Sequence, residues 1–113
     1  MKDMMTSELL LVICNVPDLQ VAETITTQLL QRKLVACVNQ LPPVVSTYRW
    51  QDQIEQSTEI PLHIKTSAEN FASVSEAICA LHPYQVPEII AIPITDALDA
   101  YAKWVKKECV VEH

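Results

Sequence analysis

Cysteine and histidine are the side chains in this sequence best suited to hold a soft or borderline metal ion. Cys14 ends a short apolar segment, and His82 stands immediately before a proline. A thiolate together with an imidazole favours copper or zinc over magnesium or calcium. Both residues also have structural interpretations, since cysteine is often buried in cores and a histidine at a helix end often bonds to a carbonyl.

The spacing of the cysteines argues against a locally encoded metal or redox motif. No C-x-x-C pair occurs among the four cysteines, which are Cys14, Cys37, Cys79 and Cys109. We expect four free thiols and a cytoplasmic location, where thiols stay reduced. The longest apolar run is far shorter than the ~20 residues that cross a bilayer, and the acidic N-terminal residues are unlike a signal peptide, so we expect no membrane partner.

Composition excludes several other functions. The chain contains no glycine, whereas a phosphate-binding loop, a dinucleotide fingerprint and a nucleophile elbow all require it. Eight basic against 14 acidic residues give a net charge of −6, which disfavours nucleic acid as a partner. No Ser/His/Asp order or carboxylate pair emerges, so we do not expect an enzyme.

The first half of the chain predicts a strand, a helix and a long hairpin that position these groups. Residues 9–14 are wholly apolar, as in a buried strand, and residues 17–33 have helical spacing that begins with a proline. Residues 35–50 and 58–66 are rich in β-branched residues and predict the two arms of a hairpin with a polar tip at 51–53.

The second half predicts a helix, a strand and a final helix. Apolar residues three and four apart predict a helix capped by Ser67 and ended by Pro83. Residues 88–94 predict the last strand, and Asp96 begins a helix. One face of this final helix carries Leu98, Tyr101 and Val105.

This order is typical of one α+β domain over residues 1–113, of the ferredoxin-like βαββαβ class with an antiparallel sheet and an extra C-terminal helix. Residues 1–8 are unpatterned and predict a loose tail. The expected strand order is last, first, third, second. That topology brings to one end of the sheet Cys14, Trp50, Glu59, His82, Tyr84 and Glu88.

Two further pairs have alternative interpretations. Tyr48 and Trp50 are two residues apart on one face of the hairpin, and we expect them to pack against a partner. Glu59 and Lys65 predict an ion pair, either in solvent or between subunits.

Several segments, in this order, resemble the CutA divalent-cation tolerance family over roughly residues 9–108. They are Cys14-Asn-Val-Pro-Asp18, Leu34-Val-Ala-Cys-Val-Asn39, Tyr48-Arg-Trp50, Ile64-Lys-Thr66 and the specific block Leu81-His-Pro-Tyr-Gln-Val-Pro-Glu-Ile-Ile90. The resemblance implies a stable homotrimer of ferredoxin-like subunits, similar in architecture to PII signalling proteins and linked to copper tolerance. It also implies metal ligands at Cys14 and His82.

The chain departs from this family at three places, one of which is Pro42-Pro43, where the family usually has a Pro-Gly step. Leu81 stands where some members have a second histidine, so a metal site would need a water, a carboxylate such as Glu88, or a neighbouring chain. The hairpin tip lacks the usual glycine and lysine, although aspartate tolerates the left-handed conformation that the turn needs.

Two functions therefore remain open. The first is a trimeric protein that binds copper, or another divalent metal, in response to metal ions. The second is a PII-like signalling or scaffolding trimer that binds a small molecule or partner protein in an intersubunit cleft, with metal binding incidental. Possible cleft residues are Trp50, Glu59, Lys65, Tyr84 and Glu88.

Overall fold

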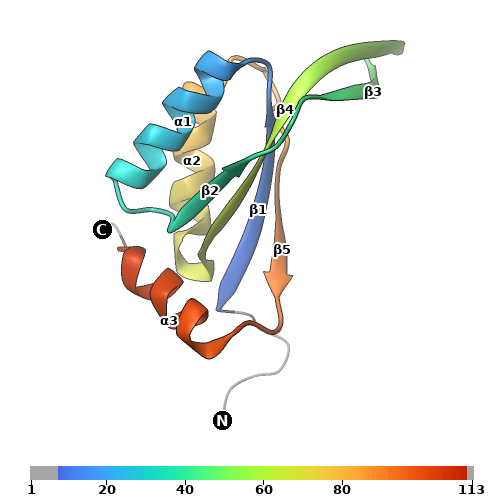
Figure 1. Ribbon diagram of the computed structural model, residues 1–113. Helices are drawn as coiled ribbons and strands as arrows, with labels where there is room; N and C mark the ends of the chain where they lie inside the picture. The colour runs from blue at the N-terminus through green and yellow to red at the C-terminus, as the bar shows by residue number, and fades with distance from the viewer. Residues whose placement is uncertain (1–7, 112–113) are drawn as a thin grey trace.

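The central strand of the fold is β1 (Leu9–Val16), which pairs antiparallel with β4 (Gln53–Ser67) and β5 (Ile89–Ile94). β2 (Cys37–Gln40) pairs with the inner part of β4, and β3 (Val44–Trp50) pairs with its outer part. In this computed structural model, which describes residues 8–111, the strand order is β2-β4-β1-β5 (Figure 1). The predicted ferredoxin-like order is confirmed.

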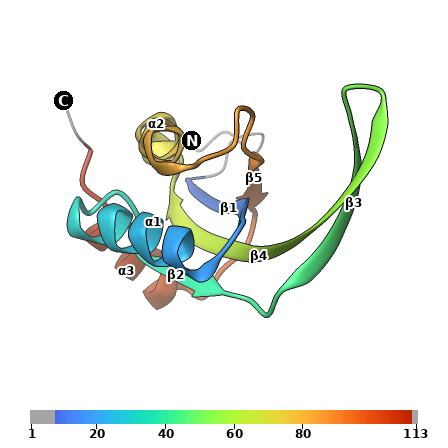
Figure 2. The ribbon, with the colours of Figure 1, turned by 90° about the horizontal axis from the view of Figure 1, so that it is seen from above.

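Two helices, α1 (Leu19–Gln31) and α2 (Phe71–Leu81), lie side by side on one face of the sheet (Figures 1 and 2). A short 3-10 turn, Ala68–Asn70, leads into α2. The last helix, α3 (Asp99–Glu108), packs against β4 and β1 at the end of the sheet opposite the hairpin. Among residues 8–111, no helix has the length and apolar character needed to cross a membrane.

The helix ends differ from the sequence prediction. Asp18 is the N-cap of α1, where its side chain accepts from the Val21 N–H at 2.9 Å, so Pro17 precedes the helix. Ser67 bonds to the Asn70 side chain instead of capping α2, because the 3-10 turn intervenes. The final helix starts at Asp99, three residues after the predicted Asp96.

The hairpin has a longer second arm than predicted. The arm over residues 35–50 is interrupted at Pro42 and Pro43, which lack the N–H needed to continue a ladder. The other arm begins at Gln53, five residues before the predicted start at 58. Its turn places Gln51 and Asp52 at φ values of 50° and 64°, and the hairpin curves away from the body (Figure 2).

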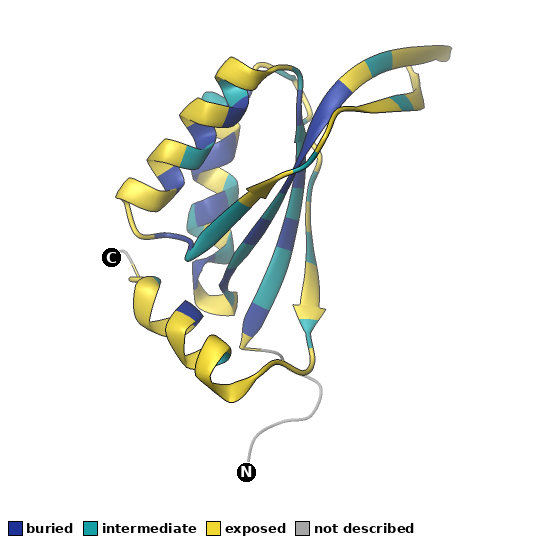
Figure 3. Cartoon of the chain, in the orientation of Figure 1, coloured by how far each residue is buried: buried dark blue, intermediate teal, exposed yellow. Residues whose placement is uncertain are grey.

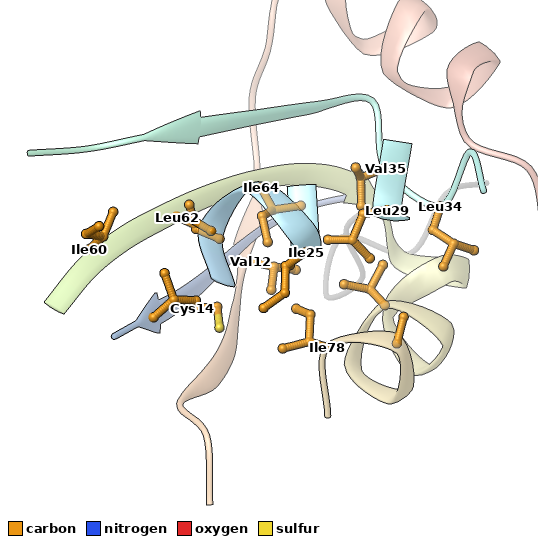
Figure 4. Packing of buried hydrophobic residues seen from close by; sticks show 14 residues of the cluster. Val12, Cys14, Ile25, Leu29, Leu34, Val35, Ile60, Leu62, Ile64 and Ile78 are labelled. Carbon is orange, nitrogen blue, oxygen red and sulfur yellow. The ribbon is translucent and has the colours of Figure 1, made fainter. Parts of the chain in front are cut away.

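The core fills the space between the sheet and the two helices (Figure 4). Alternate residues of β1 and β4 point into it, and Val12, Cys14, Leu62 and Ile64 are each 0% exposed. The alternation follows from strand geometry, since successive side chains point to opposite faces. Figure 3 shows the buried residues along the sheet and the inner sides of α1 and α2.

The opposite face of the sheet carries a second, exposed apolar set. Ile13 pairs with Ile90, and Leu11 pairs with Ile92. Ile90 and Ile92 are 48% and 45% exposed in the single chain. This face, which we call the open face, therefore leaves apolar surface in water.

Most of the predicted N-terminal tail, residues 1–7, lies outside the described residues. Glu8 is described, and its carbonyl accepts from the Ala68 N–H at 2.9 Å. The predicted tail of residues 1–8 thus includes one residue whose backbone is hydrogen-bonded, and for residues 1–7 the tail stays a prediction.

Candidate functional site

The hairpin end of the sheet brings together four separate parts of the chain. β1 ends there at Val16, α2 ends at Leu81, and β5 begins at Ile89. The segment 82–88 connects α2 to β5 and faces the hairpin across a cavity. The predicted gathering of candidate residues therefore occurs at this end.

Cys14 lies inside the core at this end of the sheet. Its side chain is 0% exposed, and Figure 4 shows it beside Leu62. The Sγ atom lies 3.8 Å from the carbonyl oxygen of Asn15. Burial, followed by the negative charge of Glu88, raises the pKa of the Cys14 thiol to about 12. At neutral pH this residue is a protonated core thiol.

His82 connects the end of α2 to the end of β1. Its ring Nδ1 accepts from the Tyr84 N–H at 3.2 Å, so the ring proton lies on Nε2. The Nε2 N–H then donates to the Asn15 carbonyl at 2.8 Å. Only 7% of His82 is exposed, and its ring packs on Tyr84 with centroids 4.6 Å apart.

These contacts do not suit a metal site as they stand. Copper binding would require the Cys14 thiol to ionise inside the core and the His82 ring to give up a hydrogen bond. Within the described part of the chain, no three His, Cys, Asp or Glu side chains are grouped so that they could hold a metal ion. Copper ligation by Cys14 and His82 thus stays a prediction.

A cavity of about 750 Å³ lies between the hairpin and the segment 82–88. Its size is within the usual range for small-molecule sites. The hairpin side chains reach it because alternate residues of β3 and β4 share one face. Residues that line the cavity include Tyr48, Trp50, Glu55, Glu59, Tyr84 and Glu88.

Hydrogen bonds fix the tyrosines and Glu59 in this cavity. Tyr84 bonds to Glu59 and to Ser57, and burial together with the Glu59 carboxylate raises the pKa of Tyr84 to about 12. The Tyr84 phenol therefore keeps its proton and donates a hydrogen bond to the Glu59 carboxylate. Tyr48 reaches Ser57 with an O–O distance of 3.2 Å.

Four of the five predicted cleft residues line this cavity, and the fifth does not. Lys65 lies on the open face farther along β4, where its ammonium group donates to Asn39. Six residues of strand place it about 20 Å from Glu59, so the two cannot pair within one chain. The intersubunit form of that ion pair stays a prediction.

Glu55 was not predicted to be a cleft residue, and Tyr48 was predicted only to pack against a partner. Both line the cavity. The feature that could have placed both residues in the cleft is the strand pairing of Tyr48 with Glu55, which follows from a two-residue turn at Gln51 and Asp52. Residues 53–57 are polar, and without the turn register their alternation carries little information.

The fold and the cavity define a class: a ferredoxin-like domain with a projecting hairpin and a ligand-sized cavity at its base. The chain belongs to a family described as "CutA1 divalent ion tolerance protein", whose pattern matches residues 10–108. A divalent-cation tolerance protein CutA from Thermus thermophilus is 41% identical over 96 residues, which cover 85% of this chain and 93% of that protein.

Solved structures agree with this assignment. The crystal structure of CutA from Xylella fastidiosa has a TM-score of 0.89 and 45% identity, with 92% of this chain and 100% of that chain covered. A structure described as the periplasmic divalent cation tolerance protein CutA from Archaeoglobus fulgidus has a TM-score of 0.86 and 37% identity, with 88% and 97% covered.

Proposed function

We propose that this protein acts in divalent-cation tolerance as a homotrimeric, non-enzymatic binding protein whose ligand site is the cavity between the hairpin and the segment 82–88. The observation that carries the proposal is the cavity itself, a concave space of about 750 Å³ with aromatic and acidic walls. Family membership supplies the link to divalent cations. We further propose a cytoplasmic location, which cell fractionation tests.

The open face supports the proposed trimer. Ile90 and Ile92 expose nearly half of their surface, and they pair with Ile13 and Leu11 of the central strand. A contiguous apolar patch of this kind is typical of an interaction surface. A closed three-fold assembly would cover the same patch on every subunit.

Light scattering tests the assembly. We expect the parent to be a trimer at micromolar concentration and the Ile90→Glu/Ile92→Glu variant to dissociate, because two buried charges would face the interface. Leu98→Glu is the matched control, since Leu98 is 76% exposed at the start of α3. A monomeric parent would overturn the proposal.

Thermal denaturation tests the cavity. A ligand that binds only the folded state raises the Tm, so we expect one class in a panel of cationic, anionic and neutral small molecules to do so. The shift should be smaller in Trp50→Leu and unchanged in Trp104→Leu, because Trp104 lies on α3, away from the cavity. No shift with any class would overturn the cavity as the ligand site.

Copper binding is the second candidate, favoured by the short distance between the ends of β1 and α2. The His82 Nε2 lies 2.8 Å from the carbonyl of Asn15, the residue after Cys14. Ligation would require this hydrogen bond to break and the buried Cys14 thiol to ionise. A carboxylate such as Glu88 or a neighbouring chain would complete the ligand set.

Calorimetric titration of the reduced protein with Cu(I) and Cu(II) tests this candidate, and native mass spectrometry counts the metals. We expect Cys14→Ser and His82→Ala to lower the affinity, and the exposed Cys79→Ser control to leave it unchanged. Binding should also weaken as the pH falls, because a protonated imidazole cannot ligate. Equal affinity in all variants would leave Cys14 a core thiol and His82 a structural residue.

A further inference from the structure

The cavity walls have an unusual charge balance for a small-molecule site. Three carboxylates line it, from Glu55, Glu59 and Glu88, and its lining contains no lysine or arginine. A phosphate or carboxylate ligand would meet only like charges there. The electrostatics of the site therefore favour a cation.

Glu59 is the most buried of the three carboxylates. The residue is only 7% exposed, and its carboxylate accepts from the Tyr84 phenol. No ion pair to Glu59 occurs among residues 8–111, so a neutral donor stabilises the charge without balancing it. A buried carboxylate without a counter-charge is costly, and a cation in the cavity would remove that cost.

The aromatic walls favour an organic cation over a bare metal ion. Trp50 and Tyr48 are 39% and 41% exposed and face the cavity from β3. Tyr84 is held on the opposite wall by its ring contact with His82. Aromatic faces attract ammonium groups through the ring quadrupole, whereas a hard or borderline metal ion requires several oxygen, nitrogen or sulfur ligands in a defined geometry.

The spacing of the carboxylates indicates an elongated ligand. Glu55 and Glu59 lie on the same face of one strand, four residues and about 13 Å apart along β4. Glu88 lines the cavity from the start of β5. Ammonium groups at both ends of an extended aliphatic chain could meet separate carboxylates, with the methylene groups against Trp50.

We propose that this cavity binds a linear aliphatic polyamine, with ammonium groups on Glu59 and Glu55 and the chain packed against Trp50 and Tyr48. The inference rests on the proposed function of the cavity as a ligand site. The proposed occupant is a free polyamine. The same chemistry could come from the ammonium group of Lys65 of a second copy, and the test below separates the two.

Calorimetric titration with spermidine, and with triethylene glycol as a neutral compound of similar length, tests the proposal. We expect saturable binding of spermidine alone. Loss of one charge-assisted contact should weaken binding about tenfold or more in Glu59→Gln. Trp50→Leu should weaken binding about three- to tenfold. Glu69→Gln, an exposed acid outside the cavity, is the matched control and should stay within about twofold of the parent.

The variant Lys65→Gln identifies the source of the cation. If the occupant is a free polyamine, Lys65→Gln should bind spermidine with the same affinity as the parent. A tighter or newly detectable affinity in Lys65→Gln would mean that a neighbouring Lys65 fills the cavity, and it would overturn the proposal. Equal spermidine binding by Glu59→Gln, or none by the parent, would also overturn it. If an anionic or neutral compound instead raises the Tm of the parent more than that of Trp50→Leu, the proposed cavity function survives and only the polyamine assignment fails.

Discussion

The two halves of β4 belong to one strand of 15 residues and yet have different surroundings. Residues 60–66 lie between β1 and β2, and all of them are buried or half-buried. Residues 53–58 pair only with β3, and all except the half-buried Ser57 are exposed. Backbone pairing is continuous along the strand, so the difference in burial comes from the elements that pack against the side chains.

This contrast separates stability from recognition. The inner half contacts α1 and α2 through the core in Figure 4, where packing determines which residues are tolerated. The outer half carries Glu55, and the buried Glu59 at the junction of the two halves also lines the cavity. A hairpin held mainly by backbone bonds can present polar and aromatic groups without disturbing the core.

The largest expected effect comes from truncating the same residue type in each half. Ile64→Ala should lower the free energy of unfolding by about 2–5 kcal/mol, because Ile64 is fully buried. Ile54→Ala, at a residue that is 71% exposed, should change it by less than about 0.5 kcal/mol. Chemical denaturation at fixed protein concentration measures both. A large loss for Ile54→Ala would show that assembly buries the outer half.

Alkaline pH should affect the inner half through Cys14, which pairs with Leu62 of β4. The pKa of the thiol rises from 9.0 to about 12 on folding, so its contribution is fully present below pH 9 and is lost between pH 9 and 12. That shift corresponds to at most about 4 kcal/mol.

Denaturation at several pH values from 8 to 11 measures this loss. Cys14→Val should flatten the decline, while Cys79→Ser, at an exposed cysteine, should follow the parent. A decline of the same steepness in Cys14→Val would assign the alkaline loss to other groups.

A third pair of variants compares hydrogen bonding in the two halves. The Thr66 hydroxyl is buried and donates to the Leu34 carbonyl at 2.7 Å. Thr66→Val leaves that carbonyl without this donor and should cost about 1–2 kcal/mol. Thr58→Val, at an exposed position, should be nearly neutral in the same urea titration. Equal losses would mean that strand propensity, not the buried bond, determines the effect.

The smallest effect is expected at the hairpin tip. Asp52 has a φ of 64°, a region that costs a non-glycine residue energy, so Asp52→Gly should stabilise the hairpin by a few tenths up to about 1 kcal/mol. A thermal melt measures the change, and Asp99→Gly in the first turn of α3 should instead destabilise. Destabilisation by Asp52→Gly would contradict the turn assignment.

Much of the fold could be predicted because alternation and helical spacing are local signals. The run 9–14 and the apolar positions of α2 identified their elements directly. The start of β4 at Gln53 could not be predicted, because residues 53–57 are polar and become a strand only by pairing with β3. The start of α3 was wrong because Asp96 is a good N-cap residue, whereas the helix begins at Asp99.

The candidate site was predictable in location and less so in chemistry. Topology alone placed Trp50, Glu59, Tyr84 and Glu88 at one end of the sheet, and all four line the cavity. The bond from His82 to the Asn15 carbonyl joins residues 67 positions apart, so its formation depends on tertiary geometry that no spacing encodes. The roles of Trp50, Glu59, Tyr84 and Glu88 in binding stay predictions.

Within residues 8–111, the left-handed conformation is adopted by Lys33, Gln51 and Asp52, in a chain that has no glycine and seven prolines. Such a composition restricts the denatured chain, because every residue carries a Cβ and seven have a fixed φ. Each glycine replaced by another residue at a compatible site lowers the entropy lost on folding by the equivalent of about 0.4–1 kcal/mol. Part of this protein's stability therefore comes from the restricted conformational freedom of its unfolded chain, and not from a contact in the folded state.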